Sequence, residues 1–194
     1  SKPNQRVWYV APTYRQAKAI CWNVLKEKMI YHKWVKNINH SDLTITLKNN
    51  STITLRGSDN EQSLRGVGLN FLCIDEFADV SQEAWFEVLR PTLSDTKGHA
   101  LFCGSPRGFG NWSYELFKQG ETNKDWASFK YTTIEGGNVD EDEVEQAKQD
   151  LDIRTFQQEY EATFVNYSGM IYYNFSRESN IIEKYEKDTA VLHI

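Results

Sequence analysis

The stretch FLCIDEFAD, residues 71–79, decides the fold class, because it joins a short apolar strand to two adjacent carboxylates. Residues 71–74 form a continuous apolar run, which is typical of a strand that is buried on both faces. Asp75 and Glu76 follow at once. We therefore expect both carboxylates at the end of a buried strand, on the edge of the core.

Two further apolar runs have the same context. One spans residues 7–10 and the other ends near Cys103, and each is followed by turn residues and a helical pattern. After Pro12, Thr13 and Gln16 have the spacing of a capping box. Apolar residues then recur with the period of an amphipathic helix, at Ala17, Ile20, Cys21, Val24 and Leu25.

The remaining patterns predict a mixed chain. Residues 43–57 alternate around a polar turn at 48–51, which predicts a β-hairpin. The alternation in WASFKYTT, residues 126–133, predicts a strand. Helical patterns cover residues 84–89 before Pro91, residues 112–119, a helix that runs from a capping box at Asp140 and Glu143 to about residue 150, and a helix marked by Ile153, Phe156, Tyr160 and Phe164.

This order of strands and helices predicts an α/β fold, a mostly parallel sheet flanked by helices, with right-handed crossovers and the hairpin as an insertion. Ligands in such folds bind at the carboxyl ends of the strands. Asp75, Glu76 and Ser105 are therefore expected on one rim.

Composition excludes several classes of protein. The chain has 194 residues, of which 40% are hydrophobic and 25% charged, and no apolar run is long enough to span a membrane. Three cysteines are an odd set, typical of reduced core residues in a cytoplasmic compartment, and no Cys/His spacing suggests zinc. Residues 1–36 carry a net charge of +7 and residues 121–161 a net charge of −8, so one face can meet a polyanion.

An Asp–Glu pair at the end of a strand has a specific use in nucleotide hydrolysis. The Asp holds Mg²⁺, commonly through water, and the Glu polarises the water that attacks the terminal phosphate. The hydroxyl of Ser105, in Gly104-Ser105-Pro106, and the guanidinium of Arg65 in the preceding loop are candidates for contacts with phosphate. The alternatives are that the carboxylates favour the start of a helix near Ser81, that Gly-Ser-Pro is a simple turn, and that Arg65 is a solvated loop charge.

The phosphate-cradling loop of such enzymes, G-x-x-x-x-G-K-[ST], has no match, because the sequence contains no Gly-Lys dipeptide. Either the chain is not a P-loop enzyme, or it begins after its P-loop.

Four segments resemble, in order, the large terminase subunits of tailed bacteriophages, the ATPase motors that pump viral DNA into a procapsid. They are VWYVAPTYRQAK, GSDNEQSLRGVGLNFLCIDEFADV, LFCGSPRG and FQQEYEATFVNYSGMIYYNF. The resemblance implies a P-loop NTPase-like (ASCE) fold that binds ATP and Mg²⁺. It implies Asp75 on the metal, Glu76 as the catalytic carboxylate, Gly104 and Ser105 in the motif that couples ATP state to DNA movement, and Arg65 as an arginine that acts between ring subunits.

The resemblance also implies an organisation. Residues 1–165 are expected to be an ATPase domain that lacks its P-loop, and residues 166–194 a linker and first strand toward an absent RNase H-like nuclease. Such a piece alone is expected to bind ATP poorly and to cleave no DNA. Expected partners of the parent protein are double-stranded DNA, the small terminase subunit, the portal of the procapsid and further copies in a ring, in the host cytoplasm and without a membrane.

Two other interpretations remain at this stage. A helicase-like ATPase shares the Asp–Glu pair and a serine motif on the next strand, but it requires a second motor domain. A non-catalytic remnant would keep the sheet and lose the chemistry, which the missing P-loop favours.

Overall fold

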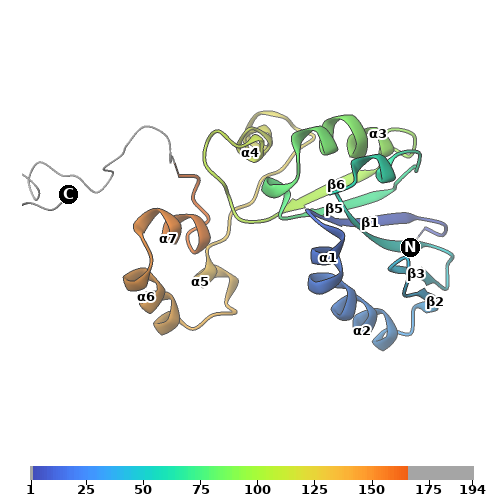
Figure 1. Ribbon diagram of the computed structural model, residues 1–194, viewed down its shortest axis with the longest axis horizontal. Coiled ribbons are helices and arrows are strands. Elements are labelled where there is room, and N and C mark those ends of the chain that lie inside the picture. The colour runs from blue at the N-terminus through green and yellow to red at the C-terminus, as the bar shows by residue number, and fades with distance from the viewer. Residues whose placement is uncertain (1, 166–194) are drawn as a thin grey trace, which may run out of the picture.

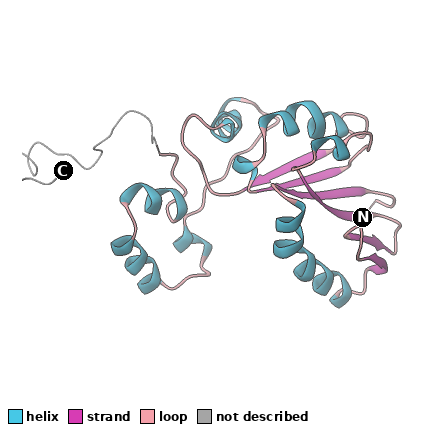
Figure 2. Cartoon of the chain, in the orientation of Figure 1, coloured by secondary structure: helices cyan, strands magenta, loops and turns pink. Residues whose placement is uncertain are grey.

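A computed structural model describes residues 2–165, and the expected linker at 166–194 lies outside the described residues. The described part contains a sheet between two layers of helix, with a small lobe of helices beside it (Figures 1 and 2). In this part of the chain, no helix combines the length and the apolar character needed to cross a bilayer.

The sheet has six strands in the order β2-β3-β4-β1-β5-β6. β1, β4, β5 and β6 pair in parallel, whereas β2 and β3 add two antiparallel strands at one edge. The predicted α/β class with a mostly parallel core is therefore confirmed. The strands are β1 (Arg6–Ala11), β2 (Val35–Asn39), β3 (Thr44–Leu47), β4 (Thr52–Gly57), β5 (Phe71–Asp75) and β6 (His99–Cys103).

The predicted hairpin is confirmed as β3 and β4, and it belongs to the main sheet. Ile45 pairs with Ile53 across the antiparallel ladder, while β4 pairs in parallel with β1 on its other side. The hairpin thus extends the parallel core to one side.

Each face of the sheet is covered by a helix that buries its own cluster. On one face Val10, Leu72 and Ile74 pack with Trp85 and Leu89 of the second helical segment. That segment comprises the π-helical turn η4 (Ala84–Leu89) and α3 (Arg90–Thr92), and the predicted apolar set at 84–89 is buried there.

On the other face lies a continuous helix made of α1 (Tyr14–Ala17), the π-helical turn η1 (Lys18–Trp22) and α2 (Asn23–Tyr31). Ala17 and Trp22 are buried against the sheet, whereas Ile20 is 50% exposed and Val24 is 53% exposed. The predicted apolar face is therefore wrong for Ile20 and Val24. A π-helical turn adds one residue to the helix, so the buried positions after it shift by one along the sequence.

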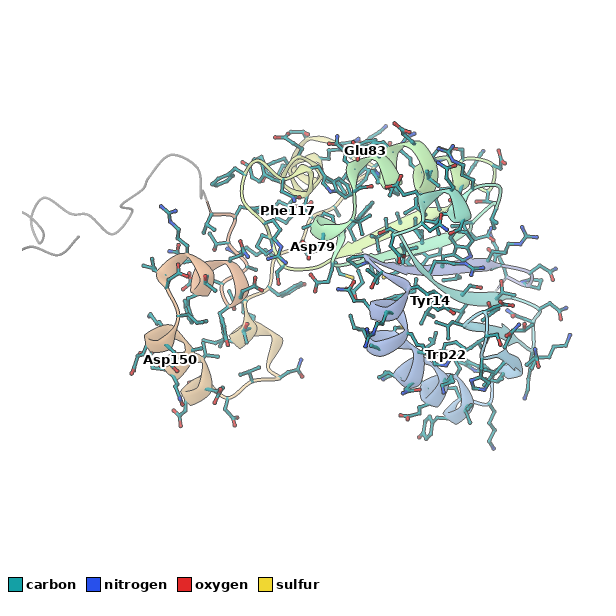
Figure 3. The ribbon with its side chains drawn as sticks, viewed as in Figure 1. Tyr14, Trp22, Asp79, Glu83, Phe117 and Asp150 are labelled. Carbon is teal, nitrogen blue, oxygen red and sulfur yellow. The ribbon has the colours of Figure 1, made fainter. Side chains whose placement is uncertain are left out.

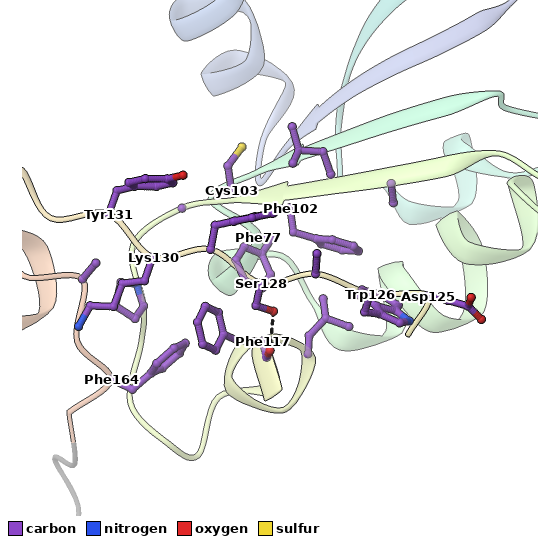
Figure 4. A pocket seen from close by; sticks show the side chains of 18 residues that line it. Phe77, Phe102, Cys103, Phe117, Asp125, Trp126, Ser128, Lys130, Tyr131 and Phe164 are labelled. Carbon is purple, nitrogen blue, oxygen red and sulfur yellow. Dashed lines mark hydrogen bonds between the residues drawn. The ribbon is translucent and has the colours of Figure 1, made fainter. Parts of the chain in front are cut away.

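The predicted strand at residues 126–133 is also wrong. This segment is extended but unpaired, and a pocket of about 600 Å³ separates its residues 125–131 from Ala100–Gly104, at the outer edge of β6 (Figure 4). Alternation makes a segment suitable for a sheet, but a ladder requires a backbone within about 5 Å.

Four helices follow β6: α4 (Trp112–Thr122), α5 (Thr133–Gly136), α6 (Glu141–Asp150) and α7 (Ile153–Glu159). We call α5–α7 the lobe, because these helices stand apart from the sheet in Figure 1. Helix α6 occurs as predicted, but Asp140 makes no capping hydrogen bond; the capping box forms at Thr132 and Glu135 instead. Helix α7 ends at Glu159, so Phe164 lies beyond it and packs with Tyr114 and Phe117 of α4.

Candidate active site

The carboxyl ends of β5 and β6 bring the two predicted motifs together. Asp75 is the last residue of β5 and is in register with Cys103, the last residue of β6. A Cβ atom added to Gly104 would lie 3.0 Å from Glu76 Cα and 3.3 Å from Glu76 Oε2. Glu76 and Gly104 are therefore in direct contact, and Ser105 is the next residue on the same rim.

The backbone at this contact is unusual on both strands. Glu76 adopts the left-handed conformation with φ of 47°, and Gly104 has φ of +147°. A left-handed glutamate costs about 1–2 kcal/mol relative to an ordinary conformation. Strain of this kind, kept by a packed surrounding, is common at functional sites. Here it turns the chain sharply after Asp75, so that both carboxylates leave the end of one strand.

Asp75 is held by groups from three elements. The hydroxyl of Tyr9, from β1, donates to Oδ2 in a short hydrogen bond. Oδ1 accepts from the Glu76 backbone N–H at 3.1 Å and from the Cys103 thiol at 3.3 Å. The carboxylate therefore has a fixed orientation at the rim.

Charge and burial shift the titration of the surrounding groups. Burial, and then the nearby carboxylates of Asp75 and Asp79, raise the pKa of Glu76, whereas Arg107 opposes the rise. Burial and the hydrogen bond to Asp75 raise the pKa of Tyr9, so its hydroxyl stays a donor. The neighbouring Cys73 thiol and burial raise the pKa of Cys103.

All three cysteines are free thiols, as the sequence predicts. Cys73 Sγ and Cys103 Sγ lie 4.0 Å apart, and burial raises the pKa of Cys21 to about 11. The thiols of Cys21 and Cys103 are therefore protonated at neutral pH, and they act as packing groups, with Cys103 also a weak donor to Asp75.

Arg65 does not join this group in the described residues. It follows η2 (Glu61–Leu64), and its Nε donates to Gln62 Oε1 at 3.0 Å within the same exposed loop. The interpretation of the carboxylate pair as a cap for the helix near Ser81 also fails, because the Ser81 hydroxyl accepts from the Ala84 N–H at 3.0 Å and fills that role.

Sequence reasoning missed two members of the site, Tyr9 and Arg107. Tyr9 faces Asp75 because β1 and β5 are paired with Tyr9 opposite Cys73, two residues before Asp75 on the same face. A predicted strand register would have found this pair. Arg107 pairs with Asp79, which is labelled in Figure 3 near the end of the sheet that faces the lobe.

A magnesium ion fits this rim only as a partner of a bound nucleotide. The part of the chain that the structure describes has no cluster of three or more His, Cys, Asp or Glu side chains that could hold a metal. Magnesium bound with nucleotides, however, takes most of its ligands from water and phosphate and needs only one or two carboxylates. The oriented carboxylate of Asp75 meets that requirement.

The arrangement thus places a fixed carboxylate, a strained second carboxylate and a serine-containing turn within one parallel rim. In a hydrolytic site the first would hold a cation–phosphate complex and the second a water molecule. A pKa that is raised toward neutrality makes Glu76 a better proton acceptor than an ordinary exposed glutamate.

Comparisons with known proteins agree with this geometry. A family model described as phage terminase large subunit matches residues 14–162. The terminase large subunit of Escherichia phage T5 is 33% identical over 180 residues, which are 90% of this chain and 41% of that protein. The terminase large subunit of Thermus phage G20c is 26% identical and covers 89% of this chain and 42% of its own length.

Solved structures show the same fold. The large terminase ATPase domain of Thermus phage P74-26 is 25% identical, with a TM-score of 0.73 over 84% of this chain and 78% of that domain. The large terminase of another thermophilic bacteriophage is 17% identical, with a TM-score of 0.76 over 92% of this chain and 45% of that protein. It has also been solved with ADP and with ATP-γ-S. The chain thus spans about two fifths of the curated relatives it matches.

Proposed function

The chain belongs to the phage terminase large subunit family, and from this premise we propose that its sheet carries the hydrolytic carboxylates of the ATPase motor that moves viral DNA into a procapsid. The observation that carries the proposal is the contact between Glu76 and Gly104 at the ends of two parallel strands. That contact joins the two motifs on which nucleotide hydrolysis and its coupling would depend.

Each residue on the rim has a proposed role. Asp75, oriented by Tyr9, holds the magnesium–phosphate complex, in part through water. Glu76 positions and polarises the attacking water and accepts its proton. Gly104 allows β6 to approach Glu76 closely, so that Ser105 on the same turn senses whether the terminal phosphate is present.

We propose ATP and Mg²⁺ as the ligands. ADP and ATP-γ-S are the nucleotides bound in the solved large terminase of the second thermophilic bacteriophage. The metal would neutralise phosphate charge as the bond to the terminal phosphate breaks. The phosphate-binding loop expected from the resemblance is a proposal about the longer protein, as are the nuclease and the division into residues 1–165 and 166–194.

Arg65 fits a role between subunits better than one within its own rim. It is exposed on a loop away from Asp75 and Glu76, and its hydrogen bond to Gln62 is weak enough to exchange. We propose that in a homo-oligomeric ring it approaches the nucleotide of a neighbouring copy.

The partners of the longer protein follow from the family. We propose double-stranded DNA as the transported substrate, and the small terminase subunit and the portal of the procapsid as assembly partners, in the host cytoplasm. A motor that contacts DNA at a few phosphates does not need a basic surface overall, so a net charge of −5 is compatible with this role.

The experiment replaces Asp75 by Asn in a large subunit of the relatives' length that contains this chain. We expect the loss of Mg²⁺-dependent ATP hydrolysis and of DNA translocation, measured by protection of packaged DNA from nuclease. Asp95→Asn, which removes an exposed carboxylate far along the chain, is the matched control and should keep both activities.

The competing functions give different results in the same assay. A wild-type protein that binds no ATP would support the non-catalytic remnant. A protein that unwinds duplex DNA would support the helicase-like ATPase. An Asp75→Asn variant that packages DNA at the wild-type rate contradicts the proposed site.

A further inference from the structure

Arg107 connects the acidic turn after β5 to the lobe. Its Nε and Nη2 donate to Asp79 Oδ1 and Oδ2 at 3.2 and 3.0 Å, so the guanidinium engages that carboxylate with two parallel hydrogen bonds. Its Nη1 lies 3.7 Å from Oε1 of Glu159, at the end of α7. One side chain thus contacts both parts of the molecule.

Asp79 is directly attached to the candidate site. It ends the short helical turn η3 (Phe77–Asp79), and its backbone N–H donates to the carbonyl of Glu76 at 2.9 Å. The neighbouring carbonyls of Ala78 and Val80 accept from Asn111 and Trp112 of the α4 region. The turn that carries Glu76 is therefore fixed to α4 on one side and held by Arg107 on the other.

The two contacts of Arg107 differ in strength. A bidentate arginine–carboxylate pair is directional, whereas a single charge contact at 3.7 Å is not a hydrogen bond of normal length. The Asp79 contact should therefore persist when the Glu159 contact opens. All three side chains are about 40% exposed, so the pairs add little to stability and their effect is on position.

Charge gives the contact a consequence for the lobe. Glu76, Asp79 and Glu159 are close enough to influence one another electrostatically, and Arg107 is the cation placed among them. Without the guanidinium, three carboxylates would face each other between the rim and α7. Like charges at this separation repel, and salt would weaken the repulsion.

We propose that Arg107 is a positioning residue that couples the position of the α5–α7 lobe to the turn that presents Glu76. This inference rests on the proposed hydrolytic function for its consequence in catalysis, but not for the structural link itself. The lobe is then connected to the site while the Arg107–Glu159 contact is closed and is released from it when that contact opens.

The structural link is tested by hydrogen–deuterium exchange on this chain, without nucleotide. Glu159→Gln should speed amide exchange in α7 by about threefold, the size expected for an exposed ion pair, and leave the turn at residues 76–80 unchanged. Arg107→Gln should speed exchange in both segments, and the effect in α7 should shrink at high salt. Arg107→Lys keeps the charge and should restore α7 but not the turn.

The control is Lys118→Gln, which breaks an exposed ion pair to Glu121 within α4 and does not touch the lobe. If Glu159→Gln and Arg107→Gln change α7 no more than Lys118→Gln does, the inference is wrong.

The catalytic consequence is tested by steady-state ATP hydrolysis in the longer large subunit. Arg107→Gln and Glu159→Gln should lower kcat with little change in KM for ATP, because they alter the placement of Glu76 and not nucleotide binding. Unchanged kcat in both variants would overturn the coupling even if the exchange result held. Loss of activity in Glu76→Gln is measured in parallel, so that failure of the proposed function is recognised separately.

Discussion

Glu76 is the residue at which strain, charge and contact coincide. Its left-handed backbone, its raised pKa and its contact with Gly104 each have an independent physical cause. A residue kept in such a conformation by its surroundings is expected to serve the chemistry of the site and not the stability of the fold. Substitutions on either side of the contact, at Gly104 and at Glu76 itself, should therefore have different effects.

Gly104 is the partner that the close approach requires. Replacement by alanine would place a methyl group 3.0 Å from Glu76 Cα, at a φ of +147° that side chains rarely adopt. We expect Gly104→Ala to lower the free energy of unfolding by about 1–3 kcal/mol, measured by urea denaturation of the chain. Gly110→Ala is the control, because a methyl group there meets nothing within 4 Å. Equal effects of the two substitutions would contradict the close packing of β6 against Glu76.

The raised pKa of Glu76 makes stability depend on pH. Burial raises this pKa in the folded chain above its value in the unfolded chain, so the folded state binds the proton more tightly. Folding is therefore favoured at low pH by this group, and that contribution is lost as pH rises through the folded pKa. A glutamine at the same position does not titrate.

We therefore expect Glu76→Gln to be more stable than the wild type at pH 7 and about equal to it near pH 4. Denaturation series at several pH values, in EDTA and without nucleotide, measure the difference. A difference that is constant with pH, or that grows toward pH 4, would show that Glu76 is not desolvated as described.

At the level of elements, the helix at residues 14–31 shows how a local irregularity changes what is buried. The π-helical turn η1 moves Trp22 onto the sheet, where its ring contacts His40 edge to face, and moves Ile20 and Val24 toward solvent. A helix of regular period would have buried Ile20.

This difference predicts opposite outcomes for two alanine substitutions. Trp22→Ala removes a large side chain that is 3% exposed and should cost about 3–5 kcal/mol of unfolding free energy. Ile20→Ala removes a half-exposed side chain and should change stability by no more than about 0.5 kcal/mol. Chemical denaturation of both variants measures this. A larger loss at Ile20 than at Trp22 would restore the regular periodicity.

The sequence was sufficient for elements whose pattern is local. The runs at 7–10 and 71–74 and the hairpin at 43–57 have strand periods and turn residues that depend on nothing far away. The strand β2 and the π-helical turns carry no such pattern. The segment at 126–133 has the pattern but lacks a neighbouring backbone, which only the tertiary structure decides.

The candidate site shows the same division. Asp75, Glu76 and Ser105 were predicted on one rim, because parallel strands bring their ends together. Tyr9 and Arg107 were missed because their partners lie 66 and 28 residues away and depend on register and loop path. Arg65 was placed by motif order alone, and its position in an exposed loop follows from contacts within that loop.

At the level of the whole molecule, the sheet and the lobe have different tasks. The sheet holds the rim rigidly between two buried clusters, whereas the lobe stands beside the carboxyl ends of the strands. Charge follows this division: residues 1–36 are basic, and residues 121–161, which include the lobe, are acidic. Such a molecule can present opposite charges to neighbours in a ring while its active rim stays fixed.

The central claim is that Glu76 is the catalytic carboxylate of a packaging ATPase, and ATP turnover by the longer large subunit carrying Glu76→Gln tests it most directly. We predict that ATP still binds with the wild-type Kd while kcat falls by about 10²–10⁴-fold, and that Glu83→Gln, on an exposed helix turn, keeps the wild-type rate. Hydrolysis by Glu76→Gln at the wild-type rate would contradict the claim.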